Sequence, residues 1–259
     1  MSEPRLEELA RLLRIVDRLR AEDGCPWDRE QTLESMIPCA LEEAAEVADA
    51  VASGSMEDSC EELGDLLMNV FLMSRIAEQD GAFSMAEVAR GIADKLIRRH
   101  PHVFGDTKVD DSVAVVSHWE RIKKEEKPQA RLSRMDELPS GLPPLAAAAK
   151  RVDRAASVGF VWPSASAAWE KVEEELEELR AASVDDHATG EEEVGDVLFA
   201  LVAWCRHRSI DADLALRRAN QKFERRFRDV EAQVQDPRES SLDELLAAWE
   251  RAKGRELRR

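Results

Sequence analysis

Apolar side chains recur every three or four residues along most of the chain, which is the period of the α-helix. These stripes predict helices over residues 4–20, 41–51, 56–76, 84–99, 113–124, 145–156, 213–234 and 242–253, with two acidic helices between residues 171 and 201. A helix is also expected to begin at Thr32, and Pro38 should kink or restart it before residues 41–51. Alternating runs of Val, Ile and Thr are scarce. We therefore expect an all-α protein.

A stretch rich in proline interrupts these helices near the middle of the chain. It contains Pro128, Pro139, Pro143 and Pro144, and Ser140 and Gly141 lie among them. Such a composition is typical of a connection between domains. We predict an N-terminal domain over residues 1–127, a linker over 128–145 and a C-terminal domain over 146–259.

Carboxylates gather at helical spacing in the second half of the chain. Glu174, Glu175 and Glu178 share one face of a helix, since each residue turns the helix by about 100°. Glu193 and Asp196 share a face of the next helix. If the two helices fold back on each other, the five acids meet and repel, which a hard cation such as Mg²⁺ would compensate. Because 35% of the chain is charged, a solvated acidic face is the other interpretation.

The first half carries the same motifs in the same order. Residues 41–47 match 173–179, residues 60–70 match 191–201, residues 93–100 match 220–227, and WERIK at 119–123 matches WERAK at 249–253. Four ordered blocks at a nearly constant offset indicate a tandem duplication. The carboxylates of the first copy are Glu42, Glu43, Glu46, Glu62 and Asp65.

Basic residues accompany the acids in both copies. In the second copy they are Lys171, Lys222, Arg225, Arg226 and Lys253. Acids for a metal and cations for phosphate oxygens are the two halves of a Mg-nucleotide site. Trp249 could stack on a base or ribose, or serve as an anchor at the edge of the core.

Net charge and cysteine usage narrow the function classes. The net charge of −17 should repel nucleic-acid phosphates, so we expect no stable binding of nucleic acid. The four cysteines form no CxxC pair, which favours reduced thiols and a cytoplasmic protein. The first residues are charged, and no apolar run approaches the ~20 residues of a membrane span. We expect no membrane association.

The doubled EExxE…ExxD pattern, with GCPWD at 24–28 and KFERRF at 222–227, resembles the MazG family of nucleoside triphosphate pyrophosphohydrolases. The resemblance runs over nearly the whole chain. It implies tandem helical-bundle domains of the all-α NTP pyrophosphatase type and a homodimer. It also implies hydrolysis of NTP or dNTP to the monophosphate and pyrophosphate with Mg²⁺, or with Mn²⁺ in its place.

The resemblance also implies roles for particular residues. Metal binding falls to Glu175, Glu178, Glu193 and Asp196, and catalysis to Glu174 and Glu175. The substrate would be bound by Lys171, Lys222, Arg225, Arg226, Trp249 and Lys253. The C-terminal copy is the preferred active site, and a second, active or silent site comprises Glu42, Glu43, Glu46, Glu62 and Asp65.

Two other classes remain open from the sequence. A ferritin-like di-iron bundle requires Glu-x-x-His on two helices, and none of the five histidines has Glu three residues earlier. A non-catalytic nucleotide-binding regulatory or interaction protein would keep the acids and cations without turnover. Binding of Mg-NTP without pyrophosphate release would distinguish it from the enzyme.

Overall fold

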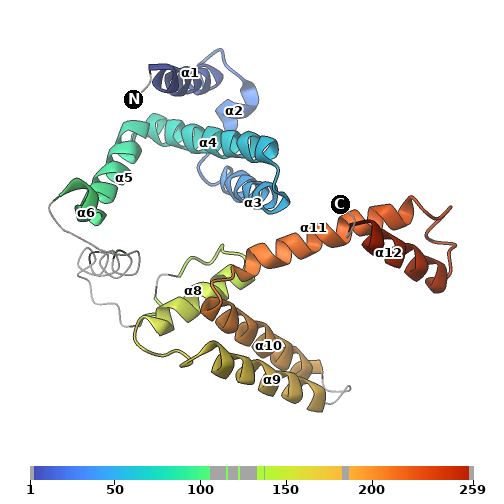
Figure 1. Ribbon diagram of the computed structural model, residues 1–259. Coiled ribbons are helices and arrows are strands. Elements are labelled where there is room, and N and C mark those ends of the chain that lie inside the picture. The colour runs from blue at the N-terminus through green and yellow to red at the C-terminus, as the bar shows by residue number, and fades with distance from the viewer. Residues whose placement is uncertain are drawn as a thin grey trace. The chain divides into compact units, whose positions relative to one another are not determined.

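The computed structural model describes residues 3–105, 133–136, 138–182 and 187–256, together with Val115 and Ile122. These residues form helices and contain no strand, so the all-α prediction is confirmed. The chain divides into two compact units, residues 1–130 and 131–259 (Figure 1). The predicted helix over 113–124 and much of the predicted linker fall outside the described residues. The limits of the linker stay a prediction.

Helix α4 is the centre of the first unit, and α1, α3 and α5 each pack against it. The helices are α1 (Glu3–Leu19), α2 (Pro26–Glu30), α3 (Ile37–Ser53), α4 (Met56–Gln79), α5 (Met85–Arg99) and α6 (Pro101–Phe104). The core contains Val16, Met36, Phe71, Leu72 and Ile76. The apolar stripe of α1 is thus buried against α4, as its period predicts.

Local sequence signals decide where the helices of this unit begin. Pro38 lies in the first turn of α3, where a missing N–H costs little, so the helix starts there and is not kinked. Gly54, with φ of +82°, ends α3, and the Ser55 side chain caps α4 by accepting from the Asp58 amide. The composition of GCPWD at residues 24–28 predicts a turn, but Pro26 opens the short helix α2 there.

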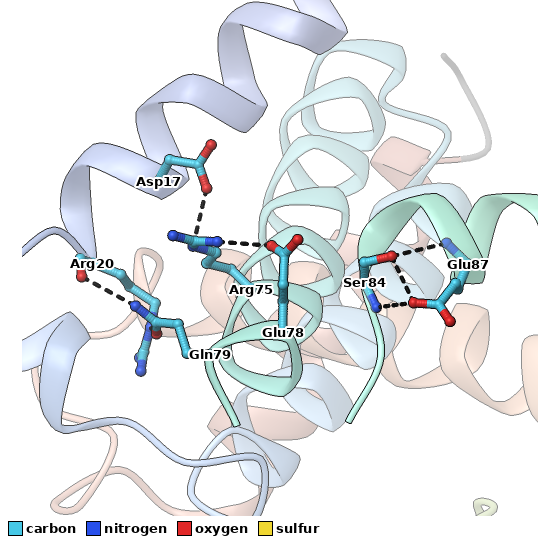
Figure 2. Close-up of polar contacts among 7 residues, drawn as sticks. All are labelled: Asp17, Arg20, Arg75, Glu78, Gln79, Ser84 and Glu87. Atoms are coloured by element: carbon cyan, nitrogen blue, oxygen red, sulfur yellow. Dashed lines mark hydrogen bonds and ion pairs between the residues drawn. The ribbon is translucent and has the colours of Figure 1, made fainter. Parts of the chain in front are cut away.

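Figure 2 shows the polar contacts at the end of α4. Arg75 on α4 lies between Asp17 on α1, with Nε 3.1 Å from Oδ1, and Glu78, whose Oε2 is 2.8 Å from Nη1. Ser84 and Glu87 form a capping box at the start of α5. The capping box satisfies two backbone N–H groups that the first turn leaves unpaired.

The second unit is organised around α10 in the same way. Its helices are α8 (Pro144–Ala156), α9 (Ala165–Ala181), α10 (His187–His207), α11 (Ala212–Glu231) and α12 (Leu242–Glu256). Val152 of α8 packs with Val202 and Ala203 of α10 in the core. Gly190 in the connection between the acidic helices predicts a loop that includes Thr189 and Gly190, but both residues lie in the first turn of α10.

The duplication is visible in an ion pair that both units share. Arg206 Nε on α10 donates to Asp153 Oδ1 on α8 at 3.0 Å, and Arg75 of α4 holds Asp17 of α1 at 3.1 Å. Arg206 follows Asp196 at the same spacing as Arg75 follows Asp65. Thus α8, α9 and α10 correspond to α1, α3 and α4. None of the described helices has the length and apolar character needed to cross a membrane.

Candidate carboxylate sites on paired helices

The second carboxylate site lies between α9 and α10, which run side by side in opposite directions (Figure 1). Glu175, Glu193 and Asp196 each place one carboxylate oxygen within 4.8 Å of the others. Glu175 is buried, with 7% of its surface exposed, and Asp196 is exposed. Two helices therefore converge three of the predicted acids on one point.

A lysine partly compensates this concentration of charge. Lys171 Nζ lies 2.7 Å from Oε1 of Glu174 and 2.7 Å from Oε1 of Glu175. These hydrogen bonds, first from Glu174 and then from Glu175, raise the pKa of Lys171 above its ordinary value. At neutral pH the lysine is thus a fixed positive charge beside the buried carboxylate.

Glu193 lacks such compensation. Its pKa is raised, first by burial and then by the charges of Glu178, Glu175 and Asp196. Its Oε2 atom is buried and has no hydrogen-bond partner. Glu178 contributes its charge here, but it is not among the three acids whose oxygens converge.

The first copy builds a similar site between α3 and α4. There the converging oxygens belong to Glu43, Glu46 and Glu62, again within 4.8 Å of one another. Burial is the main cause that raises the pKa of Glu43, followed by Asp65 and Glu46. Burial and then Glu46 and Asp65 raise the pKa of Glu62. Glu42 is exposed and lies outside the converging group.

The two sites differ in the residue that precedes their glutamates. The repeat places Cys39 where the second copy has Lys171. No lysine or arginine pairs with Glu43, Glu46 or Glu62 in the part of the chain that the structure describes. The first site is therefore the more strongly repulsive of the two.

Except for Lys171 on α9, the predicted phosphate-binding cations lie on α11 and α12. Arg225 Nη2 and Arg226 Nε pair with Glu256, at 3.3 and 2.6 Å. Lys253 Nζ lies 2.8 Å from Glu250 Oε1, and Lys222 is exposed. These residues thus form a cluster of their own on the second unit.

Trp249 belongs to this cluster. Its ring centroid is 5.3 Å from that of Phe223, and the Arg226 guanidinium carbon is 5.9 Å from it. Helix α11 packs against α8 and α12 and leads away from the α9–α10 pair (Figure 1). The structure therefore places Lys171 beside the carboxylates, whereas Arg226 and the tryptophan contact each other on α11 and α12.

A hollow on α9 and α10 was not predicted. It has a volume of about 370 Å³ and is lined by Ala165, Ser166, Trp169, Trp204 and Arg208. The rings of Trp169 and Trp204 meet edge to face, with centroids 5.1 Å apart. Helical geometry puts Trp169 about 120° around α9 from Glu175, so the hollow opens on another side of the helix pair. The two tryptophans could have been noticed as aromatics that the first copy does not repeat.

The carboxylate sites suit a hard divalent cation. Opposite ligands of Mg²⁺ lie about 4.2 Å apart, so oxygens already within 4.8 Å need little movement to share one ion. The unpartnered Oε2 of Glu193 offers a ligand atom that no protein donor satisfies. The fold and these sites define an all-α protein with carboxylate sites for a divalent ion on paired helices.

Comparisons with known proteins agree with this class. A family model described as "MazG nucleotide pyrophosphohydrolase domain" matches residues 31–104, which include α3 to α6. Over 261 residues the chain is 42% identical to the nucleoside triphosphate pyrophosphohydrolase of Escherichia coli (strain K12), covering 97% of this chain and 99% of that protein.

A second relative is the nucleoside triphosphate pyrophosphohydrolase/pyrophosphatase MazG of Thermotoga maritima, 39% identical over 94% of each chain. The crystal structure of a MazG-related protein from the same species covers 44% of this chain and 98% of its own, at 27% identity and a TM-score of 0.40, which is too loose for a structural comparison. The chain belongs to the MazG family of nucleotide pyrophosphohydrolases and is an enzyme. The resemblance drawn from its motifs is confirmed.

Proposed function

We propose that this enzyme hydrolyses a nucleoside triphosphate to the monophosphate and pyrophosphate, with Mg²⁺ held at the α9–α10 site. The observation that supports this most directly is the convergence of Glu175, Glu193 and Asp196 within 4.8 Å beside Lys171. The names of the bacterial relatives support the reaction. Glu178, whose charge already acts on Glu193, completes the proposed metal ligands.

The bound ion would neutralise phosphate charge and lower the pKa of a water molecule. With an ion held by Glu175, Lys171 would be free to leave the glutamates and bind a phosphate oxygen. Glu174 loses its partner in the same movement and can accept a proton from the attacking water. The water oxygen would form a bond to the α-phosphorus as the α–β phosphoanhydride bond breaks, so that the monophosphate and pyrophosphate are released.

We further propose that the enzyme is a homodimer whose partner supplies the phosphate-binding cations. Several large apolar side chains of the second unit are exposed, which is unfavourable for a monomer. They include Val194, Leu198, Leu216, Phe223 and Leu246. Because α11 leads away from its own α9–α10 pair, Lys222 and Arg226 are better placed to reach the site of a second copy. Trp249 would approach the nucleoside in that arrangement.

The test of the reaction is a panel of NTPs and dNTPs incubated with Mg²⁺, Mn²⁺ or a chelator. We expect pyrophosphate and the monophosphate as direct products, dependence on the divalent ion, and no orthophosphate. Direct release of orthophosphate, or turnover in the presence of the chelator, would contradict the proposal.

A further inference from the structure

Asn69 on α4 is a buried amide without a partner. Only 1% of its surface is exposed, and neither Nδ2 nor Oδ1 has a hydrogen-bond partner. An amide needs donors and acceptors, and leaving both unpaired in the interior is costly. Native proteins keep few such groups, and a buried water or a bound ligand is the usual partner of a buried amide like this one.

The position of Asn69 connects it to the first carboxylate site. Glu62, Asp65 and Asn69 are spaced three and four residues apart and lie on one face of α4. Continuing along that face leads to Leu72 and Ile76 in the apolar core. The amide thus lies between the carboxylates and the core, about 6 Å along the helix axis from Asp65.

The second copy has no equivalent group. The repeat places Ala200 opposite Asn69, just as it places Lys171 opposite Cys39. Cys39 packs against the core from α3, and α3 packs against α4, which carries Asn69. The two positions at which the copies differ therefore lie at the same end of the carboxylate site. Compared with the second copy, the first copy lacks a lysine and has an additional amide side chain. The first copy therefore lacks one cation for phosphate oxygens and has one additional amide for an uncharged part of a ligand.

We propose that the first carboxylate pair is a nucleotide site in its own right, in which the amide of Asn69 hydrogen-bonds the nucleoside part of a metal-bound nucleoside triphosphate. This rests on the nucleotide chemistry proposed above. Glu43, Glu46 and Glu62 hold the metal and phosphate end. One helical turn deeper, the amide offers an NH2 group that donates and a carbonyl oxygen that accepts, which match the polar edge of a base or the hydroxyl of a sugar.

The experiment isolates the first site in the full chain. Glu193→Gln and Asp196→Asn together disable the second site, and binding of α,β-methylene analogues of the common NTPs and dNTPs with Mg²⁺ is then measured by calorimetry. Asn69→Leu replaces the amide by an apolar group of the same heavy-atom shape. Asn69→Ala introduces the residue that the second copy has at the equivalent position, Ala200. We expect binding of the preferred nucleotide to weaken at least about tenfold in both variants.

Two further readouts separate a ligand contact from a structural one. Mn²⁺ binding at the first site, followed by electron paramagnetic resonance, should not change, because the carboxylates remain. The melting temperature of Asn69→Leu without ligand should rise, because two unsatisfied polar atoms are removed. Unchanged nucleotide affinity in both variants would show that the amide serves only an internal water, and would overturn the proposal.

Absence of nucleotide binding in the parent with the disabled second site would overturn it too. The analogues cannot be hydrolysed at the α–β bridge. Pyrophosphate release by the unaltered enzyme therefore tests the proposed reaction separately. Failure of the reaction and failure of the Asn69 site can thus be distinguished.

Discussion

Lys171 Nζ lies 2.7 Å from Oε1 of Glu175, so the buried glutamate of α9 has a positive partner one helical turn before it. The same lysine holds Glu174 at 2.7 Å. In the first copy Cys39 stands in its place, and Glu43 has no such cation. We expect Lys171 to exchange these glutamates for a phosphate oxygen when metal and substrate bind.

Replacing Lys171 by Met should separate metal binding from substrate binding. Without the lysine the carboxylates are more negative, so Mg²⁺ should half-saturate the enzyme at a lower concentration. The KM for the nucleotide should rise about tenfold, since a charge-assisted hydrogen bond to phosphate is lost. Steady-state kinetics with Mg²⁺ and nucleotide varied independently measure both.

Lys171→Arg keeps the charge and is the matched control. Its KM should stay close to that of the wild-type enzyme. A Lys171→Met enzyme with unchanged KM would show that the lysine only neutralises the glutamates.

Replacing Glu175 by Gln should abolish turnover while the protein stays helical. The substitution keeps the shape of a buried side chain but removes the charge of a proposed metal ligand, and we expect a loss of more than about a hundredfold. Pyrophosphate release and circular dichroism are the measurements. Glu177→Gln, an exposed acid on the opposite face of α9, should be unaffected. Wild-type release by Glu175→Gln would assign the reaction to the first copy.

The raised pKa of Glu193 predicts a dependence of stability on pH in the absence of metal. A carboxyl group whose pKa is higher in the folded state keeps its proton there longer. Its protonation therefore favours folding below its unfolded pKa of ~4.3. That contribution is lost as the pH rises through the higher folded value.

Glu193→Gln removes the repelled charge. With a chelator we expect its melting temperature to exceed that of wild type at pH 7, on the order of 1–3 °C, and the difference to shrink at pH 5. With Mg²⁺ at pH 7 the order should reverse, because the ionised glutamate then binds the ion. A variant that is less stable than wild type at pH 7 under both conditions would contradict the repulsion.

Mixing two inactive enzymes tests whether the partner supplies the cations. One carries Glu175→Gln, and the other carries Lys222→Ala and Arg226→Ala. If cations act across the dimer, a randomly mixed population should recover about a quarter of the wild-type sites, all in mixed dimers. Cations acting within one chain would give no recovery. Co-expression with two affinity tags, followed by assay of the doubly purified mixed dimer, provides the measurement, and in that sample about half of the sites should be active.

Much of the fold was predictable because helices are local. The periods of three and four residues placed α1, α4, α5, α8, α11 and α12 within a few residues of their observed limits, whereas α9 begins earlier and α10 ends later than expected. The repeat was readable because the acids kept their spacing in both copies. The contacts of Lys171 also follow from its sequence neighbours, since Glu174 and Glu175 are one turn away.

Contacts between distant helices could not be read in this way. The sequence gives five equivalent acids in each copy, yet the third converging oxygen comes from Asp196 in one and Glu46 in the other. The sequence suggests a phosphate as the partner of Arg226. In the fold, Arg226 donates a hydrogen bond to Glu256, 30 residues away. In the sequence Asn69 is a single polar residue within an apolar segment. Only the structure shows that it is buried and that its amide has no hydrogen-bond partner.

The sequence alone thus determined that the chain is all-helical and duplicated, and that it carries acids suited to a divalent ion, because these depend on spacing along single helices. The tertiary structure decided which acids meet, which of them are neutralised, and that the cations gather on α11 and α12. Those outcomes depend on how helices pack against each other, and packing is set by side-chain shape and burial that the order of residues does not display.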